Sequence, residues 1–413
     1  MSAGAARPAL GVASRTLESA AERILLRAAS RIRSGCLTVV LPDGRRRVFG
    51  DPASARRAEI RVLDAAAAGR LLLHGEMGAG EAYMDGQWSS PDLEALIELA
   101  AVNRSELAMG GAWWRRPLEL PQRMAHRARR NSLRQARRNI AAHYDLGNDF
   151  YRLFLDESLT YSCAVFETPE QSLFDAQRAK YRRIAEGARL RAGMHVLEIG
   201  GGWGGFALYA AGELGCRVTS ITISREQHDL ARRRVQEAGL DHLVDVQFRD
   251  YREVVGRYDA VVSIEMLEAV GAEYFATYFE AVDRALKPGG RCSLQVITMP
   301  DAAYETQRRG VNWVQTYIFP GGLCPSLAVI EQSLHGTRLL LRSATDIAPS
   351  YARTLRAWRT RFLENLDAVR GLGFDDRFAR MWEYYLALSE AGFATGLTQD
   401  QQIVLEKARG VGA

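Results

Sequence analysis

Residues 196–205 read Val-Leu-Glu-Ile-Gly-Gly-Gly-Trp-Gly-Gly and are the most informative part of the chain. An apolar strand that carries Glu198 runs into a glycine cluster, and a helix is expected from Phe206 to Leu214. Glycine lets the backbone turn tightly and approach a ligand closely, and a helix N-terminus offers N–H groups. The stretch therefore predicts a site for a nucleotide-like cofactor, with a glycine-rich turn that binds nothing as the alternative.

The spacing of the glycines distinguishes two kinds of cofactor. Gly200, Gly202 and Gly204 follow one another in steps of two residues, whereas a dinucleotide site carries the spacing G-x-G-x-x-G. An NAD site also places an acidic residue about 20 positions after the glycines, where it binds the ribose. Residues 219–224 occupy that region and contain no carboxylate. Both observations favour S-adenosylmethionine (SAM) over NAD.

Polar side chains near residue 222 are the candidates for the ribose contacts. SAM sites commonly carry an acidic residue here too, and Thr222, Ser224 and Gln227 are the polar groups available in its place. Ser224 and Gln227 also have the spacing of an N-terminal helix cap, which is an alternative explanation for both. Asp250 ends a later strand, where it is expected either to bind the adenine amino group or to cap a turn.

From residue 172 onward, predicted strands and helices alternate. Strands are expected at 196–199, 216–223, 244–248, 259–264, 292–298, 338–344 and 402–406. This rhythm is typical of an α/β fold with a doubly wound, mostly parallel, Rossmann-like sheet, into which helices at about 351–370 and 377–391 are inserted. Ligands bind such a sheet at the carboxyl ends of its strands. Candidate site residues should therefore lie in the segments 198–204, 222–227, 250–252, 263–268 and 295–298.

Three parts are expected along the chain. Residues 1–110 are predicted to form a smaller N-terminal α+β domain, in which Pro42-Asp43-Gly44 is a turn between short strands and Gly75–Gly86 is a loop. Residues 111–138 are an arginine-rich linker, and residues 139–413 form the cofactor-binding catalytic domain.

The positive charge is concentrated in the linker. The whole chain carries a net charge of +5, but residues 115–138 contain nine arginines and one glutamate, so the rest of the chain is net negative. Apolar residues lie between the arginines, and a basic, partly amphipathic segment suits an anionic lipid surface. Nucleic acid is the competing polyanion, and a solvated linker is the plain alternative. We expect the lipid surface and no nucleic acid.

Cysteine usage and apolar content limit where the protein is expected to work. The five cysteines include no C-x-x-C pair, which argues against a disulfide framework and against a zinc site. No run of 18 or more apolar residues occurs, and the first residues have no apolar secretory region. A cytoplasmic location is expected.

Two further segments combine reactive and aromatic residues, namely His143–Tyr151 and Thr160–Ala164. Cys163 lies in the second, and such a cysteine is more often a small buried hydrophobic residue than a nucleophile. Glu265 and Glu268 follow an apolar strand, where an unpaired buried carboxylate is costly, so one of them is expected to be functional. An acid beside the helix dipole is the alternative.

Together these segments resemble the cyclopropane-fatty-acyl-phospholipid synthase family, which includes the mycolic-acid cyclopropane synthases. The resemblance covers about residues 139–407 and rests on the ordered motifs HYDLGNDFY, YSCAVF, VLEIGGGWGG, TISREQ, DYR, SIEMLEAVG, YIFPGG, YARTLRAW and RMWEYYL. In the longer bacterial members an N-terminal domain assists lipid binding and dimerisation. The resemblance therefore implies a homodimer that associates peripherally with a membrane through its N-terminal domain.

The resemblance implies methyl transfer from SAM to a cis double bond of a phospholipid acyl chain, which gives a cyclopropane fatty acid. This transfer leaves a carbocation, which needs a dry pocket with π faces or negative charge nearby. A proton must then leave the added methyl group before the ring closes. The family binds a bicarbonate ion that is thought to accept this proton. By resemblance the ion would lie near Cys163, Glu268, Ile297 and Tyr351, with Cys163 and Ile297 offering mainly backbone groups.

The expected cofactor-binding residues come from the family motifs and from the strand ends. The motifs carry over Tyr161, Ser162, Gly200, Gly202, Thr222, Gln227 and Asp250. The segments around them add Glu198, Gly201, Trp203, Gly204, Ile223, Ser224, Tyr251, Ser263 and Ile264. No metal site is expected.

Gln295 departs from the family pattern, because many members have His at this position. Glutamine can hydrogen-bond an anion but does not titrate near neutral pH. Some relatives make methylene- or methyl-branched chains from the same cation, so Gln295 leaves cyclopropane and branched products as alternatives. Methylation of a soluble small molecule and a non-catalytic binding scaffold are the further alternatives.

Overall fold

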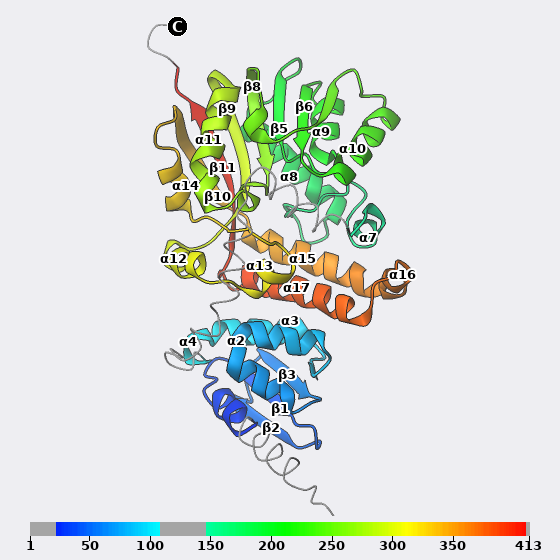
Figure 1. Cartoon of the computed structure of the whole chain (residues 1–413), viewed down its shortest axis with the longest axis vertical. Helices are drawn as coiled ribbons and strands as arrows, with labels where there is room; N and C mark the ends of the chain where they lie inside the picture. Colours follow the sequence, from blue (N-terminus) through cyan, green and yellow to red (C-terminus); the bar gives the residue numbers. More distant parts are fainter. Residues whose placement is uncertain (1–21, 108–145, 410–413) are drawn as a thin grey trace, which may run out of the picture. The chain divides into compact units, whose positions relative to one another are not determined.

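The computed structural model describes residues 22–107 and 146–409 (Figure 1). The chain divides into two compact units. One unit comprises residues 1–121 and 373–395, and the other comprises residues 122–372 and 396–413. None of the helices in the described ranges is long and apolar enough to cross a membrane. The predicted linker, residues 111–138, lies outside the described residues.

The first unit is a small α+β structure. Its four strands have the order β2-β1-β3-β4, and β1 pairs antiparallel with β2 but parallel with β3. The Pro42-Asp43-Gly44 turn joins β1 to β2, with Gly44 at a φ of 83°. The bounds of its strands and helices are β1 Cys36–Val40, β2 Arg46–Gly50, β3 Arg57–Val62, β4 Trp88–Ser89, α2 Ala66–Met84, α3 Leu93–Val102, α4 Arg104–Leu107 and α17 Asp376–Ala394.

The predicted loop over Gly75–Gly86 is wrong, because helix α2 continues through most of it. The helix breaks only at Gly75, where φ is 58° and ψ is −134°. Beyond the break, Met77, Tyr83 and Met84 are buried. Burial of these side chains outweighs the low helix propensity of the surrounding glycines, which had suggested a loop.

Helix α17 packs within the first unit, although it had been placed in the domain 139–413. It packs against α3 and α2. Tyr83 donates a hydrogen bond to Oε2 of Glu383 at 2.7 Å, and Arg380 donates to the carbonyl of Trp88 at 2.7 Å. An aromatic residue of α17, Trp382, is only 1% exposed. Residues 373–395 therefore belong structurally with the N-terminal part of the chain.

The second unit is built on a seven-stranded sheet with the order β10-β11-β9-β8-β5-β6-β7. Strands β9, β8, β5, β6 and β7 are parallel to one another, whereas β11 pairs antiparallel with β9 and with β10. The prediction of a mostly parallel α/β sheet is confirmed. The strand bounds are β5 His195–Ile199, β6 Arg217–Thr222, β7 Val244–Phe248, β8 Tyr258–Ile264, β9 Leu286–Thr298, β10 Leu339–Asp346 and β11 Gln399–Lys407.

Helices cover this sheet and are also inserted between its later strands. The helices before β9 are α7 Asn148–Arg152, α8 Leu173–Gly187, α9 Gly205–Gly212, α10 Arg225–Glu237, η2 Tyr251–Glu253, η3 Leu267–Ala269, η4 Ala272–Tyr274 and α11 Phe275–Ala285. Those after β9 are α12 Asp301–Arg309, α13 Trp313–Tyr317, α14 Leu327–Ser333, α15 Ala348–Glu364 and α16 Leu366–Gly371.

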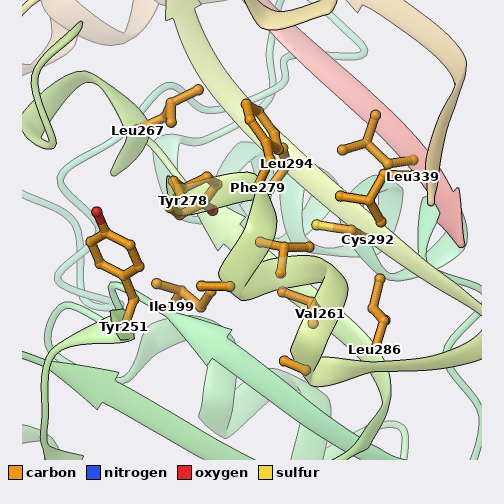
Figure 2. Packing of buried hydrophobic residues seen from close by; sticks show 14 of the residues in the cluster. Ile199, Tyr251, Val261, Leu267, Tyr278, Phe279, Leu286, Cys292, Leu294 and Leu339 are labelled. Carbon is orange, nitrogen blue, oxygen red and sulfur yellow. The ribbon is translucent and has the colours of Figure 1, made fainter. Parts of the chain in front are cut away.

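Two hydrophobic clusters bury the two faces of the sheet. Leu197 of β5 belongs to the cluster that contains Phe279 of α11, and its neighbour Val196 belongs to the cluster that contains Phe206 of α9. Successive side chains of a strand point to opposite faces, so β5 is covered on both sides, as expected for a parallel strand. Figure 2 shows the first cluster, with Phe279 among the strand residues. This packing fixes the carboxyl ends of β5, β6 and β8, where the candidate residues lie.

Candidate active site

The glycine loop between β5 and α9 allows a ligand to approach closely. Gly200, Gly202 and Gly204 have φ angles of 84°, 53° and 84°, in the left-handed region that glycine adopts without strain. The N–H groups of Gly200 and Gly201 both donate to the carbonyl of Ile221 at 3.0 Å, which ties the loop to the end of β6. A Cβ atom at Gly202 would meet no atom within 4 Å. The loop therefore has open space beside it and fits a nucleotide-like cofactor such as SAM.

Glu198 is buried beneath this loop. The residue is 3% exposed, and Ser220 Oγ donates to its Oε2 at 2.5 Å. Burial raises the pKa of Glu198 to about 7, against the opposing effects of the Ser220 hydrogen bond and the Lys180 charge. A Cβ atom at Gly201 would lie 1.9 Å from Ser220 Oγ, so only glycine fits there.

Thr222, Ser224 and Gln227 form one hydrogen-bonded cluster after β6. Ser224 Oγ accepts from the N–H of Gln227 at 3.3 Å and caps α10, and Thr222 Oγ1 donates to Gln227 Oε1 at 2.9 Å. The helix-cap explanation therefore accounts for Ser224. That these residues and the intervening Ile223 bind the cofactor stays a prediction.

Asp250 caps the short helix η2 and pairs with Arg252. Its carboxylate accepts from the Arg252 N–H at 3.0 Å and from the guanidinium at 2.7 and 2.8 Å. A carboxylate has about four acceptor positions, so one is unused by Arg252, and a contact of Asp250 with an adenine amino group stays a prediction. Nearby, Ser263 Oγ donates to the carbonyl of Ile199 at 2.8 Å and joins the ends of β8 and β5. The remaining candidates, Tyr251 and Ile264, pack against the hydrophobic clusters.

Aromatic rings lie next to the glycine loop. Trp203 Nε1 donates to Asn148 Oδ1 at 2.6 Å, so the described part of the His143–Tyr151 motif is joined to the loop. Ring centroids are 4.9 Å apart for Trp203 and Tyr151, 5.4 Å for Tyr151 and Tyr161, and 5.2 Å for Tyr161 and Trp358, which are stacked. These rings present π faces of the kind that stabilise a cation. Residues 143–145 of the motif lie outside the described residues.

Glu265 contacts two of the four residues that the resemblance assigns to an anion, Cys163 and Tyr351. The backbone N–H of Cys163 donates to its Oε1 at 2.7 Å, and Nε2 of Gln295 donates to the same oxygen at 2.8 Å. The hydroxyl of Tyr351 donates to Oε2 at 2.6 Å, while its ring packs edge-on against Trp358 at 6.3 Å. Three elements of the chain thus converge on one carboxylate.

The orientation of the Gln295 amide is fixed by its other partners. Its Nε2 also donates to the carbonyl of Cys163 at 3.1 Å, and its Oε1 accepts from Nε2 of Gln402 at 3.1 Å. Gln295 is fully buried, and both hydrogens of its amide nitrogen are used. The amide therefore presents a donor to Glu265.

Glu268 and Asp400 are the other two acids of this region. The backbone N–H of Ile297 donates to Oε1 of Glu268, while the buried Oε2 has no hydrogen-bond partner. Burial, and then the charge of Glu265, raises the pKa of Glu268 to about 8. Asp400 is fully buried, and burial together with the charges of Glu265 and Glu268 raises its pKa well above the usual range. The surroundings of both acids therefore favour the protonated form.

Lys180 supplies a buried positive charge close to these acids. Its Nζ donates to Ser162 Oγ at 2.6 Å, and burial lowers its pKa to about 8 against the attraction of Glu265 and other acidic groups. The Cys163 thiol is different, because burial raises its pKa well above the usual range. A thiol that resists ionisation is a poor nucleophile. The contribution of Cys163 to this cluster is its backbone.

Sequence reasoning did not single out Lys180, Trp358, Asp400 or Gln402. Lys180 does carry a signal, because it shares the buried face of α8 with Ala176 and Ile184 at helical spacing. The roles of Asp400 and Gln402 depend on the pairing of β11 with β9, which places them opposite Ile297 and Gln295. Short-range patterns contain no information on that register. Among the described residues, no group of acids, histidines and cysteines is arranged to hold a metal ion.

Comparison with known proteins agrees with this geometry. Residues 131–403 match the family described as mycolic acid cyclopropane synthetase. The chain belongs to this family. The mycolic acid cyclopropane synthetase match includes the glycine loop, the aromatic rings and the carboxylates of the site, and it confirms the family resemblance.

Two curated relatives and one solved structure extend the comparison. The chain is 44% identical over 384 residues to tuberculostearic acid methyltransferase UfaA1 of Mycobacterium tuberculosis, covering 91% of this chain and 88% of that protein. It is 34% identical to the cyclopropane-fatty-acyl-phospholipid synthase of Escherichia coli K12, covering 85% of this chain and 88% of that protein. The mycolic acid cyclopropane synthase CmaA1, solved with SAH and CTAB, superposes with a TM-score of 0.62 at 28% identity and covers 66% of this chain and 98% of that one.

Members of the mycolic acid cyclopropane synthetase family are SAM-dependent enzymes, and the glycine loop of this chain fits that cofactor. The protein is therefore a SAM-dependent lipid methyltransferase. The predictions of an enzyme and of SAM as its cofactor are confirmed.

Proposed function

We propose that the protein transfers a methyl group from SAM to the cis double bond of an unsaturated phospholipid acyl chain. When bound, SAM supplies an electrophilic methyl group, to which the π electrons of the alkene form the new carbon–carbon bond. The observation that carries the proposal is the placement of a half-buried carboxylate, Glu265, with the rings of Tyr161, Tyr351 and Trp358 beside the glycine loop. Aromatic rings and a carboxylate stabilise a carbocation. Methyl transfer to an alkene does not require the cluster to activate a nucleophile.

Two different products are consistent with this methyl transfer, and each defines one form of the proposal. Loss of a proton from the added methyl group, followed by ring closure, gives a cyclopropane fatty acid, and the name of the Escherichia coli relative supports this form. Formation of a double bond after a hydride shift instead gives a methylene branch, and the name of the UfaA1 relative, a methyltransferase, supports this form. Gln295 at the usual His position leaves both forms open. A methyl branch would require a further two-electron reduction. Methylation of a soluble small molecule is the remaining alternative.

The proposal extends to the membrane. Residues 1–110 and the basic segment 111–138 are proposed to hold the enzyme, as a homodimer, at an anionic membrane surface on the cytoplasmic side. The nine arginines of residues 115–138 support this, because each cation near an anionic surface contributes roughly 1 kcal/mol.

One incubation tests the central reaction. The full-length protein is mixed with SAM and vesicles of dioleoyl phosphatidylglycerol, and the fatty esters are analysed by mass spectrometry and NMR. A gain of one CH2 per modified chain is expected, and NMR separates a cyclopropane from a methylene branch. The absence of any mass gain, with SAM binding demonstrated by calorimetry, would overturn the proposed substrate. Equal turnover of a soluble acceptor without vesicles would favour the small-molecule alternative.

A further inference from the structure

The donors that would hold a bicarbonate ion already serve carboxylates of the chain, and one of them, the Ile297 N–H, donates to Glu268. The Cys163 N–H, the Gln295 Nε2 and the Tyr351 hydroxyl all donate to Glu265, at 2.7, 2.8 and 2.6 Å. A carboxylate and a bicarbonate offer the same pair of acceptor oxygens, so these donors cannot hold both at once in these positions. With Glu265 present, the residues of this site do not fit a bound bicarbonate.

The backbone of Glu265 carries a second, independent indication. Its φ is 49°, and only two other non-glycine residues in the described ranges have a positive φ, Leu159 and Arg189. A left-handed conformation costs a non-glycine residue about 1–2 kcal/mol. The position is stabilised by a hydrogen bond from the Glu265 N–H to the carbonyl of Gln295 at 2.7 Å. Glu265 thus has a backbone conformation that glycine would adopt freely, and its carboxylate accepts hydrogen bonds from three donors.

The hydrogen-bond donors and the positive charge around Glu265 favour its ionised carboxylate, whereas burial disfavours it. A backbone N–H and an amide Nε2 can only donate, so Oε1 must accept both bonds. Burial raises the pKa of Glu265, and the bonds from Tyr351 and Cys163, the Lys180 charge and the Gln295 bond oppose that rise. Because the pKa values of Glu268 and Asp400 are raised as well, the negative charge of the cluster is best carried by the acid with the most donors, which is Glu265.

We propose that the Glu265 carboxylate is the base of the reaction and takes the place of an external anion. This inference rests on the proposed function, since it names the acceptor of the proton lost after methyl transfer. Oε1 accepts two hydrogen bonds and Oε2 accepts one, so the proton is assigned to Oε2. The other donors position Glu265, and Gln295 is a positioning residue that does not itself take up the proton.

The step balances without a further reactant. One C–H bond of the added methyl group breaks, and the proton forms an O–H bond with Oε2 of Glu265. The electron pair of the broken bond neutralises the carbocation by closing the three-membered ring when the charge lies on the neighbouring carbon. If a 1,2-hydride shift first moves the charge to the carbon that bears the methyl group, the same electron pair forms the carbon–carbon double bond of a methylene branch. Glu265 keeps part of its surface exposed, and it returns the proton to solvent before the next turnover.

Two substitutions of Glu265 separate a base from a structural residue. Glu265→Gln keeps the shape of the side chain but removes its basic oxygen. Glu265→Gly removes the side chain, and glycine adopts the positive φ of this position without strain. A positioned base typically contributes about 100- to 10,000-fold to turnover. We therefore expect a loss of that size in both variants when they are assayed in buffer freed of carbon dioxide. Added bicarbonate, acetate or formate should restore turnover at least about tenfold in Glu265→Gly only, and more for the more basic anions. The wild-type enzyme should be indifferent to removal of carbon dioxide.

Arg189→Gly is the matched control, because Arg189 also has a positive φ, at 53°, and is exposed. It should leave turnover and its anion dependence unchanged. Full turnover of Glu265→Gly without an added anion, or a dependence of the wild-type enzyme on bicarbonate, would overturn the proposal. So would rescue that ignores anion basicity, which a purely structural role of Glu265 predicts.

Calorimetry with bicarbonate separates this inference from the proposed function. The wild-type protein should show no binding of millimolar bicarbonate, whereas Glu265→Gly should bind it. Bicarbonate binding to the wild-type protein would overturn the role of Glu265 whatever the lipid assay shows. Absence of lipid methylation, combined with no bicarbonate binding, would instead overturn the substrate proposal.

Discussion

Gln402 of β11 donates a hydrogen bond to Oε1 of Gln295 at 3.1 Å, across the antiparallel pair that β11 forms with β9. This contact, together with the hydrogen bond from Gln295 Nε2 to the Cys163 carbonyl, fixes which end of the Gln295 amide faces Glu265. Without the Gln402 contact, only the Cys163 carbonyl holds the amide against a turn that would present its oxygen to the carboxylate. The strand that enters the sheet late in the chain therefore orients a donor of the active site.

Substitution of Gln402 by Leu tests this relationship. The buried Oε1 of Gln295 would lose its partner, which costs about 1–3 kcal/mol of folding free energy. Turnover should fall because Glu265 loses a donor, while SAM binding stays unchanged. Urea unfolding and a turnover assay measure the two effects. Gln401→Leu, at the neighbouring position on the opposite face of β11, is the control, and an equal loss of turnover there would contradict the assignment.

The raised pKa of Glu268 predicts how stability depends on pH. Because its pKa is about 8 in the folded protein and near 4.5 when unfolded, folding favours the protonated form. Its contribution is complete below about pH 4.5 and is lost as the pH rises through about 8. In Glu268→Gln the fall in unfolding free energy between pH 5 and 9 should be smaller than in the wild-type protein. Identical slopes in urea unfolding at these pH values would contradict the prediction.

The charge of Lys180 should be visible in the pH dependence of turnover. Lys180 favours the ionised form of Glu265, so Lys180→Met should raise the pKa of that carboxyl. The acidic limb of the kcat/KM profile should then move to higher pH. Lys287→Met removes a half-exposed lysine that pairs with Asp259, and it should leave the profile unchanged. A shift of the limb in both variants would point to net charge as the cause.

Gly202 offers a test of the cofactor site that is separate from the chemistry. Gly202→Ala places a methyl group in open space at a φ of 53°, and Gly239→Ala does the same at a φ of 68°, away from the loop. Both should lose about 1–2 kcal/mol of stability from backbone strain. Only Gly202→Ala should weaken SAM binding in calorimetry. Equal SAM affinity in the two variants would remove Gly202 from the site.

The basic segment should control binding to anionic vesicles. Replacement of Arg127, Arg129 and Arg130 by Ala removes three cations, worth about 3 kcal/mol at an anionic surface, and should flatten the salt dependence of binding. Vesicle sedimentation at several salt concentrations measures this. Replacement of Arg178, Arg182 and Arg189 by Ala changes the net charge equally and should have little effect. Unchanged partitioning of the first variant would leave the segment a plain linker.

The fold was largely predictable because its strands and glycine turns carry local signals. Glu198 and the glycines after it indicated the cofactor loop, and the alternation of strands and helices indicated the parallel sheet. Glu268 was favoured over Glu265 by family motif alone, and no local pattern reports that Glu265 reaches Cys163, Gln295 and Tyr351. Those contacts join residues about 30 to 100 positions apart. Their assembly depends on tertiary packing, which periodicity and spacing do not specify.

The path of the chain after residue 372 has a consequence for synthesis. The chain leaves the second unit, forms α17 in the first, and returns as β11, which lies between β9 and β10. Asp400 and Gln402 therefore emerge from the ribosome only after β9, β10 and α17 have been synthesised. Until they do, β9 and β10 lack the strand between them and Gln295 lacks its partner. A nascent or C-terminally shortened chain would thus have the glycine loop without the completed proton acceptor.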